Sequence, residues 1–176
     1  MKPLTLLVLA LSLFSAGCDE VLAPATPSGI VTLVSQLSGA QEVPAAAAPE
    51  AATAGSLSMS MTPAGGGAYT ASFTFQIAGL VKAGVLPPPL DSGSIIVAGH
   101  VHVGAAGVVG APVLPLPISQ TAPIVTPTGG VLLTISNVAV PADVASAILA
   151  NPSGYYFNLH SALNPGGVVR GQLIKQ

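Results

Sequence analysis

Charged side chains are the scarcest feature of this chain. Its 176 residues include four Lys or Arg and six Asp or Glu, so 6% of the residues are charged, against about 25% in an ordinary soluble domain. Proteins that bind nucleic acid need a basic face, and this composition excludes nucleic acid as a partner. Disordered acidic tails and coiled coils are rich in charge and are excluded as well.

Aromatic residues are also few, at 4% with no tryptophan, although 51% of the chain is hydrophobic. Ala, Val and Leu must therefore build the core. Lys, Glu and Arg, which usually cover helix surfaces, give way to Val, Thr, Ser, Gly and Pro, and this composition favours strands over helices. The length suits one domain with a real core. We predict a single all-β domain.

Cysteine occurs once, at Cys18, so no disulfide can form within one copy. Before it, Lys2, the apolar run from Leu4 to Phe14 and the small residues Ser15-Ala16-Gly17 have the pattern of a secretory signal. The run is shorter than the roughly 20 apolar residues of a membrane-spanning helix. A lone Cys directly after such a run resembles a bacterial lipobox, in which the thiol is lipidated and the signal is cut just before it.

These features predict three parts. Residues 1–17 are a lipoprotein signal peptide, residues 18–29 are the lipidated cysteine and a Pro-bearing tether, and residues 30–176 are the folded domain. The protein is then exported and anchored by lipid on Cys18 to a bacterial membrane, on the periplasmic or cell-surface side. The alternative is an ordinary secreted protein with an incidental cysteine.

From Ile30 onward, short β-branched runs alternate with Gly, Pro and Ser, a pattern typical of a β-sandwich or barrel. One short helix is expected over residues 142–149, after Pro141 and before the sequence NPSG. About eight short strands are predicted, over residues 30–37, 55–61, 69–78, 94–103, 112–118, 130–138, 155–160 and 168–174.

Local patterns give detail to this prediction. In residues 69–78, Phe73, Phe75 and Ile77 alternate with polar residues and so share one face. The sequence AGGG at 64–67 predicts a hairpin turn before that strand. Three prolines within residues 112–117 exclude a central strand there and predict an edge.

The three histidines of the chain suggest a metal site. His100 and His102 lie two residues apart on a predicted strand, so both rings point to one face. His160 shares a face of another strand with Asn158 by the same parity. Three imidazoles with an open position suit copper, or zinc as the second choice. The alternative is that all three are hydrogen-bonded polar residues with a structural role.

The other polar residues leave alternatives open. Arg170 could pair with Glu42 or Asp143, or could attract anions to a nearby metal. The chain has no Gly-x-Ser-x-Gly motif for a hydrolase, no carboxylate pair spaced for a glycosidase and too few carboxylates for a calcium loop. The sequence gives no support for hydrolysis.

Three segments together resemble the CHRD domain, which is named for chordin and is common in exported bacterial proteins. Residues 37–44 (LSGAQEVP) are similar to its opening motif, and residues 100–104 (HVHVG) to its H-I-H-x-G motif. Residues 151–160 (NPSGYYFNLH) and 164–173 (NPGGVVRGQL) are similar to its closing motif. The resemblance covers roughly residues 33–174. It implies an extracytoplasmic β-fold without a settled activity.

A weaker likeness adds a chemical expectation. A His-Val-His strand and a Gly-bounded Arg on the last strand resemble elements of the copper site of copper–zinc superoxide dismutases, which are Greek-key β-barrels. The likeness implies a Greek-key fold, copper ligation by His100, His102 and His160, and a superoxide-steering or structural role for Arg170. The chain has no fourth histidine and no cluster for zinc. Dismutase-like catalysis is therefore the least favoured reading, and an enzyme is not predicted.

Two hypotheses follow. In the first, the protein is a membrane-tethered CHRD-domain lipoprotein that binds a copper-like ion through the three histidines, with Glu42, Asn158 and Arg170 as supporting residues. In the second, it is an adhesion or interaction module for an unknown protein partner. Glu42, Asn158 and Arg170 then join loops by buried hydrogen bonds and charge pairs.

Overall fold

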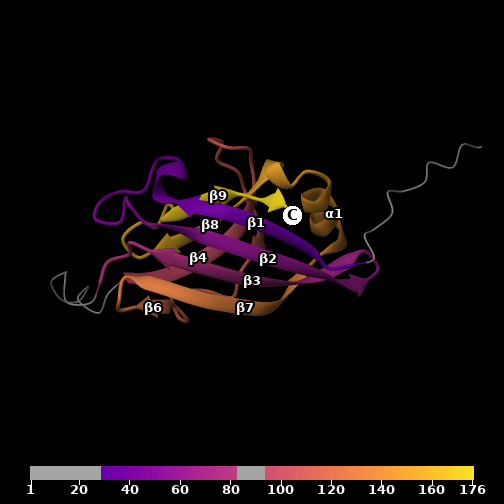
Figure 1. Cartoon of the computed structure of the whole chain (residues 1–176), viewed down its shortest axis with the longest axis horizontal. Coiled ribbons are helices and arrows are strands. Elements are labelled where there is room, and N and C mark those ends of the chain that lie inside the picture. The colour runs from indigo at the N-terminus through magenta and orange to yellow at the C-terminus, as the bar shows by residue number, and fades with distance from the viewer. Residues whose placement is uncertain (1–28, 83–93) are drawn as a thin grey trace, which may run out of the picture.

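The computed structural model describes residues 29–82 and 94–176. The predicted signal peptide, Cys18 and the tether up to residue 28 lie outside the described residues. The described chain is mostly β, an antiparallel and nearly closed barrel with one short helix (Figure 1). No helix in these two ranges is long and apolar enough to cross a membrane.

The elements are β1 (Val31–Ser38), η1 (Gly39–Gln41), β2 (Ala54–Gly65), β3 (Ala68–Ala78), β4 (Ser94–Val103), β5 (Pro112–Pro115), β6 (Ile124–Thr126), β7 (Gly130–Val140), α1 (Ala142–Ala150), η3 (Pro152–Gly154), β8 (Tyr155–Ser161), β9 (Val169–Gln172) and β10 (Ile174–Lys175).

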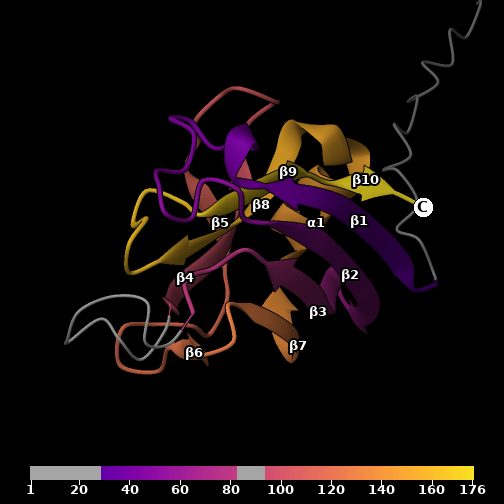
Figure 2. The same ribbon diagram turned by 60° about the vertical axis from the view of Figure 1, so that its left-hand side comes forward.

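The strand order explains how the barrel is wound. Eight strands follow one another in the order β5-β4-β8-β9-β1-β2-β3-β7, while β6 pairs with β4 and β10 with β1. β1-β2-β3, β4-β5 and β8-β9 are neighbours in both sequence and space, whereas β7 crosses over to β3, β8 to β4 and β9 to β1 (Figure 2). Such returns are typical of Greek-key folds, and they confirm the predicted all-β Greek-key barrel.

Alternation along the strands places the core inside the barrel. Phe73, Phe75 and Ile77 of β3 are buried, as predicted, while Thr74 and Gln76 are exposed. The ring of Phe157 on β8 lies 6.0 Å from that of Phe73 and 6.1 Å from that of Phe75. These contacts bind the β1–β3 hairpins to the strands that carry the histidines.

The hairpin turn and the edge strand are both found where the sequence predicted them. Gly65, Gly66 and Gly67 all have positive φ between β2 and β3, a conformation that other residues rarely adopt. The proline-containing strand β5 lies at one end of the strand order, an edge position that tolerates residues without an N–H group.

Some boundaries differ from the prediction. β5 ends at Pro115 rather than Ile118, β6 was not predicted, and the last predicted strand divides into β9 and β10. β6 has three residues, too few for a periodic pattern to show. β9 pairs with β8 and β1 whereas β10 pairs only with β1, so a change of partner divides one run of sequence.

Candidate metal centre

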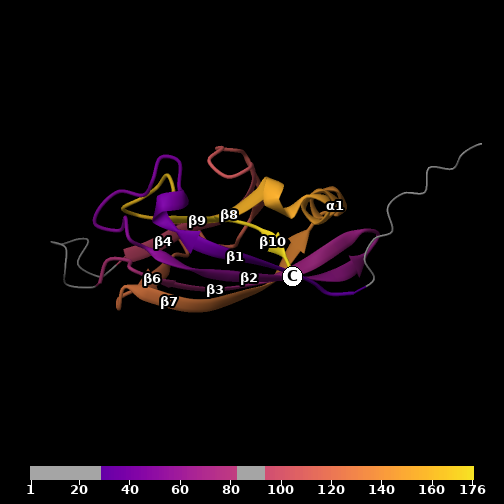
Figure 3. The same ribbon diagram turned by 45° about the horizontal axis from the view of Figure 1, so that its top comes forward.

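The candidate site lies on the outer face of β4, β8 and β9. His100 is paired with Asn158 and Asn158 with Arg170, while Ala98 is paired with His160. Residues of the other parity, such as Val101 and Phe157, face the core and are fully buried. The segment after β1 and the loop after β4 lie on this outer side of β8 and β9 (Figure 3). The polar face is therefore covered by loops rather than left to solvent.

The barrel brings the three histidines together, as predicted. Nδ1 of His100 lies 3.2 Å from Nε2 of His160. The ring of His102 is 5.3 Å from that of His100 and 6.4 Å from that of His160, measured between centroids. One ligand atom from each of the three lies within 4.8 Å of the others. Two strands far apart in the sequence thus supply one cluster.

Backbone carbonyls fix the tautomers of two rings. Nδ1 of His102 is 2.9 Å from the carbonyl oxygen of Gly110, and Nδ1 of His160 is 3.0 Å from that of Pro165. A carbonyl can only accept, so both Nδ1 atoms carry the proton and both Nε2 atoms keep a lone pair. Nε2 of His102 is buried and has no hydrogen-bond partner. An unpartnered imidazole nitrogen of this kind is a ready metal ligand.

The surroundings keep the rings neutral. Burial, followed by the neighbouring His160 and His102, lowers the pKa of His100 to about 4. Burial also lowers the pKa of His102 and of His160, although their hydrogen bonds to carbonyls act in the opposite direction. Neutral imidazole is the form that binds a metal. The cluster is thus in its ligating form at neutral pH.

The geometry and the donor set fit a three-coordinate ion. Two nitrogens bound about 2.0–2.1 Å from one ion, at tetrahedral or slightly smaller angles, lie roughly 3.1–3.4 Å apart. His100 and His160 meet that spacing at 3.2 Å, and a small movement of His102 would complete the set. His102 is buried while His100 and His160 are half-buried, so one side of the cluster stays open. Imidazole donors suit copper and zinc.

Arg170 does not point freely into solvent but holds the loop that covers the site. The side chain is 2% exposed, and Nη2 donates to the carbonyl oxygens of Ala105 at 2.9 Å and Val108 at 2.8 Å. The guanidinium carbon lies 3.4 Å from the centre of the Tyr156 ring. Tyr156 in turn stacks on His102, with ring centroids 4.9 Å apart. Arg170 thus supports His102 through one aromatic ring.

Asn158 lies between His100 and Arg170 in the strand register, and Glu42 neighbours Arg170 and Asn158. Glu42 is 6% exposed and Asn158 is 2% exposed. Burial raises the pKa of Glu42 to about 7, against the opposing effects of the Arg170 charge and of a hydrogen bond with Asn158. Asn158 also lies beside the ring of His102 and raises its pKa by a polar contact, although no hydrogen bond of good geometry joins Asn158 to Nε2 of that ring. All the predicted site residues in the described ranges therefore lie on one covered face.

Sequence reasoning missed two buried or half-buried polar residues that hold loops in place. Gln172 donates to the carbonyl oxygens of Gly104, Ser153 and Tyr155, and its parity with Arg170 could have indicated it. Glu50 is fully buried and accepts hydrogen bonds from Val81 N, Ser161 Oγ and Asn164 Nδ2 at 3.2, 2.5 and 3.1 Å. No local pattern marks Glu50, because its partners come from distant segments.

Comparisons with known proteins bear on the whole chain. No curated protein and no solved structure matches it, so the likeness to superoxide dismutases rests on motifs alone. The CHRD domain matches residues 33–173, which include β1 from Leu33 onward, every element from η1 to β9 and all three histidines. The chain belongs to the CHRD domain family.

Proposed function

We propose that this CHRD domain binds a copper-like ion through His100, His102 and His160, with zinc as the second choice. One observation supports the proposal most strongly. Three neutral imidazoles present ligand atoms within 4.8 Å of one another, and one of these nitrogens is buried without any partner. A buried polar atom left unpaired costs about 1–3 kcal/mol, and a bound ion would offset that cost. Copper is preferred because it binds nitrogen ligands most tightly in the divalent series.

The proposed setting is a bacterial membrane. Residues 1–17 would be removed as a lipoprotein signal and Cys18 would carry lipid, which would place the domain on the periplasmic or cell-surface side. The support is the sequence pattern of the N-terminus. Lipid labelling of the chain in a bacterial host tests the anchor. Label and membrane association should both be lost in Cys18→Ser, and label that persists in the variant would contradict lipidation at this residue.

Calorimetric titration with Cu(II) and Zn(II) tests the metal site. We would use the full chain in detergent with Cys18→Ser, so that no thiol contributes. Binding of one ion per chain at micromolar affinity, about −8.2 kcal/mol, or tighter is expected. Each of His100→Ala, His102→Ala and His160→Ala should abolish it. Gln76→Ala, an exposed change on β3, is the control. Binding that the histidine variants leave unchanged would refute the site.

A second candidate function, an interaction module, has its own observation. Four valines in and around the loop after β4 (residues 104–111) and the segment after β1 are 40–64% exposed. Apolar side chains that gather on a surface often mark a contact with another protein. The residues are Val43, Val103, Val108 and Val109. Under this alternative the histidine cluster has a structural role. Replacing Val108 and Val109 with Ser would then abolish partner binding, whereas the three histidine variants would leave it intact.

A further inference from the structure

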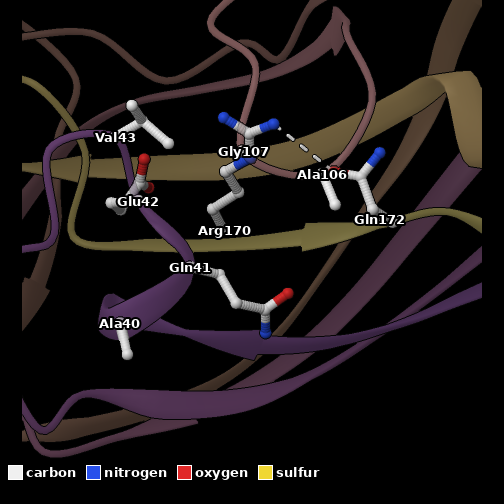
Figure 4. Close-up of a pocket in the computed structure, with 8 residues that line it drawn as sticks. All are labelled: Ala40, Gln41, Glu42, Val43, Ala106, Gly107, Arg170 and Gln172. Carbon is white, nitrogen blue, oxygen red and sulfur yellow. Dashed lines mark hydrogen bonds between the residues drawn. The ribbon is translucent and has the colours of Figure 1, made fainter.

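A small cavity lies over β9, on the same outer face as the histidines. Its volume is about 220 Å³. Figure 4 shows Arg170 and Gln172 at its floor, and the segments 40–43 and 106–107 on either side. Glu42 and Arg170 are buried, whereas the other residues of those two segments are exposed and form the mouth. A ligand in this cavity would meet both buried charged groups at once.

Arg170 offers a positive charge that is already fixed in place. The guanidinium donates from Nη2 to Ala105 O, Val108 O and Gln172 Oε1. These three contacts and the Tyr156 ring beneath hold its plane. Arginine carries five N–H donors, and these bonds within the described part of the chain leave the donors on Nη1 and Nε for a ligand. A preorganised guanidinium favours planar anions with two oxygens.

Glu42 supplies an oxygen without a partner. Its Oε1 is buried and makes no hydrogen bond. The carboxyl group cannot easily turn away, because the backbone of Gly167 packs against it. A Cβ atom at Gly167 would lie 2.4 Å from Glu42 Oε1, and Gly167 has φ of +139°, where other residues are strained. Glu42 is one of the residues that line the cavity, and its carboxyl group is held in place there by Gly167.

Arg170 and Glu42 can both bind the same anion only when Glu42 is protonated. An ionised Glu42 would repel an anion, whereas a protonated one donates a hydrogen bond to it. Arg170 is the charged group beside Glu42, and Asn158 is its hydrogen-bonding neighbour. Burial raises the pKa of Glu42 to about 7, so the protonated form is well populated near neutral pH.

We propose that the cavity binds a small carboxylate anion, which pairs with Arg170 and accepts a hydrogen bond from the protonated carboxyl group of Glu42. Binding of the anion then requires the protonated form of Glu42, so at a pH above the pKa of this group binding is accompanied by proton uptake. No covalent change is involved. The proposal does not depend on a metal at the histidines, since none of them lines the cavity.

Acetate is the probe that tests this inference. The metal-free full chain in detergent would be titrated by NMR, with the backbone amides of Gln41 and Gly107 as reporters. If only the protonated form of Glu42 binds, a pKa of about 7 makes the affinity about tenfold higher at pH 6 than at pH 8. In Glu42→Gln the amide mimics the protonated acid, so the affinity should be the same at both pH values.

Control variants separate the cavity from other causes. Lys175→Gln removes one positive charge outside the cavity and should leave acetate binding unchanged, whereas Arg170→Gln should reduce it at least tenfold. His160→Ala should retain it, which distinguishes this site from the metal centre. Absence of saturable acetate binding in the wild type would overturn the proposal. So would an affinity equal at pH 6 and pH 8, a result that does not require any variant to fold.

Discussion

The outer face of the barrel has two halves with opposite properties. On β2 and β3 the outward residues are mostly Ser and Thr and remain in contact with solvent. The hydroxyl of Thr74, for example, is exposed and lies 2.9 Å from that of Thr134. On β4, β8 and β9 the outward residues are polar as well, but Asn158 and Arg170 are almost fully buried. The difference arises from the loops that cover the second half and not from the strands themselves.

This contrast teaches where chemistry can arise in a chain with few charges. On the open half, solvent can reach the exposed hydroxyls, so the side chains have little effect on one another's energetics. On the covered half, water is excluded, and burial shifts the pKa of Glu42 upwards and that of His100 downwards. Unpartnered atoms such as His102 Nε2 and Glu42 Oε1 occur there. Both proposed sites therefore lie on the covered half.

The largest expected effect on stability comes from replacing Arg170, whose charged side chain holds the loop after β4 over the site. Arg170→Gln loses two charge-assisted hydrogen bonds to the loop at Ala105 and Val108. Because hydrogen bonds to charged groups contribute about 1.5–3 kcal/mol each, we expect a loss of about 3 kcal/mol or more in unfolding free energy. Urea denaturation measures it. A loss below about 1 kcal/mol would mean that the loop is held by other contacts.

The two buried glutamates should respond in opposite ways at pH 8. Glu50 accepts three hydrogen bonds, so Glu50→Gln should cost about 2–3 kcal/mol. Glu42→Gln should instead leave stability unchanged or raise it by about 1–2 kcal/mol, because it removes a carboxylate whose ionised form burial disfavours.

The sign follows from the raised pKa of Glu42. Its stabilising contribution is complete below 4.5, the pKa of an unperturbed glutamic acid, and is lost as the pH rises through about 7. Urea midpoints of both variants at pH 5 and pH 8 provide the measurement. Destabilisation of Glu42→Gln at pH 8 by as much as Glu50→Gln would contradict the contrast.

The histidines should have a smaller effect on stability, and this effect should be seen at acidic pH. Because the pKa of His100 is lowered to about 4, the folded metal-free protein resists protonation of this ring. Its contribution to stability is complete above about 6.5, the pKa of unperturbed histidine, and is lost as the pH falls from there towards 4. Thermal unfolding of the metal-free chain between pH 7 and pH 4.5 should show this decline. His100→Gln should show a shallower one, and an identical slope would indicate that other groups cause it.

The smallest effect should come from the open half. Thr74→Ala and Thr134→Ala each remove one side of an exposed hydrogen bond, and water replaces the missing partner. Each change should alter the unfolding free energy by about 0.5 kcal/mol or less, and the double variant by little more. Denaturant titration of the three variants checks this. A cost comparable to that of Arg170→Gln would remove the distinction between the two halves.

Much of the fold follows from local sequence. Alternation of Phe73, Phe75 and Ile77, the glycine turn after residue 64 and the prolines in β5 each have a short-range physical cause, and each predicted its element. β6 escaped prediction because three residues carry no period. The three histidines could be identified as a candidate set from the alternation of side chains along strands. His100 and His102 point to the same face of one strand, and the same alternation places His160 on one face of another strand together with Asn158.

What the sequence determined by itself is the all-β barrel, the face on which His100 and His102 point, and the family to which the motifs belong. Only the tertiary structure decided the rest. The convergence of His160 on the other two depends on the pairing of β8 with β4. The burial of Arg170 and the isolation of Glu42 Oε1 depend on the loops that cover them. Parity and turn chemistry act between neighbours, whereas desolvation depends on which distant loops happen to cover a residue.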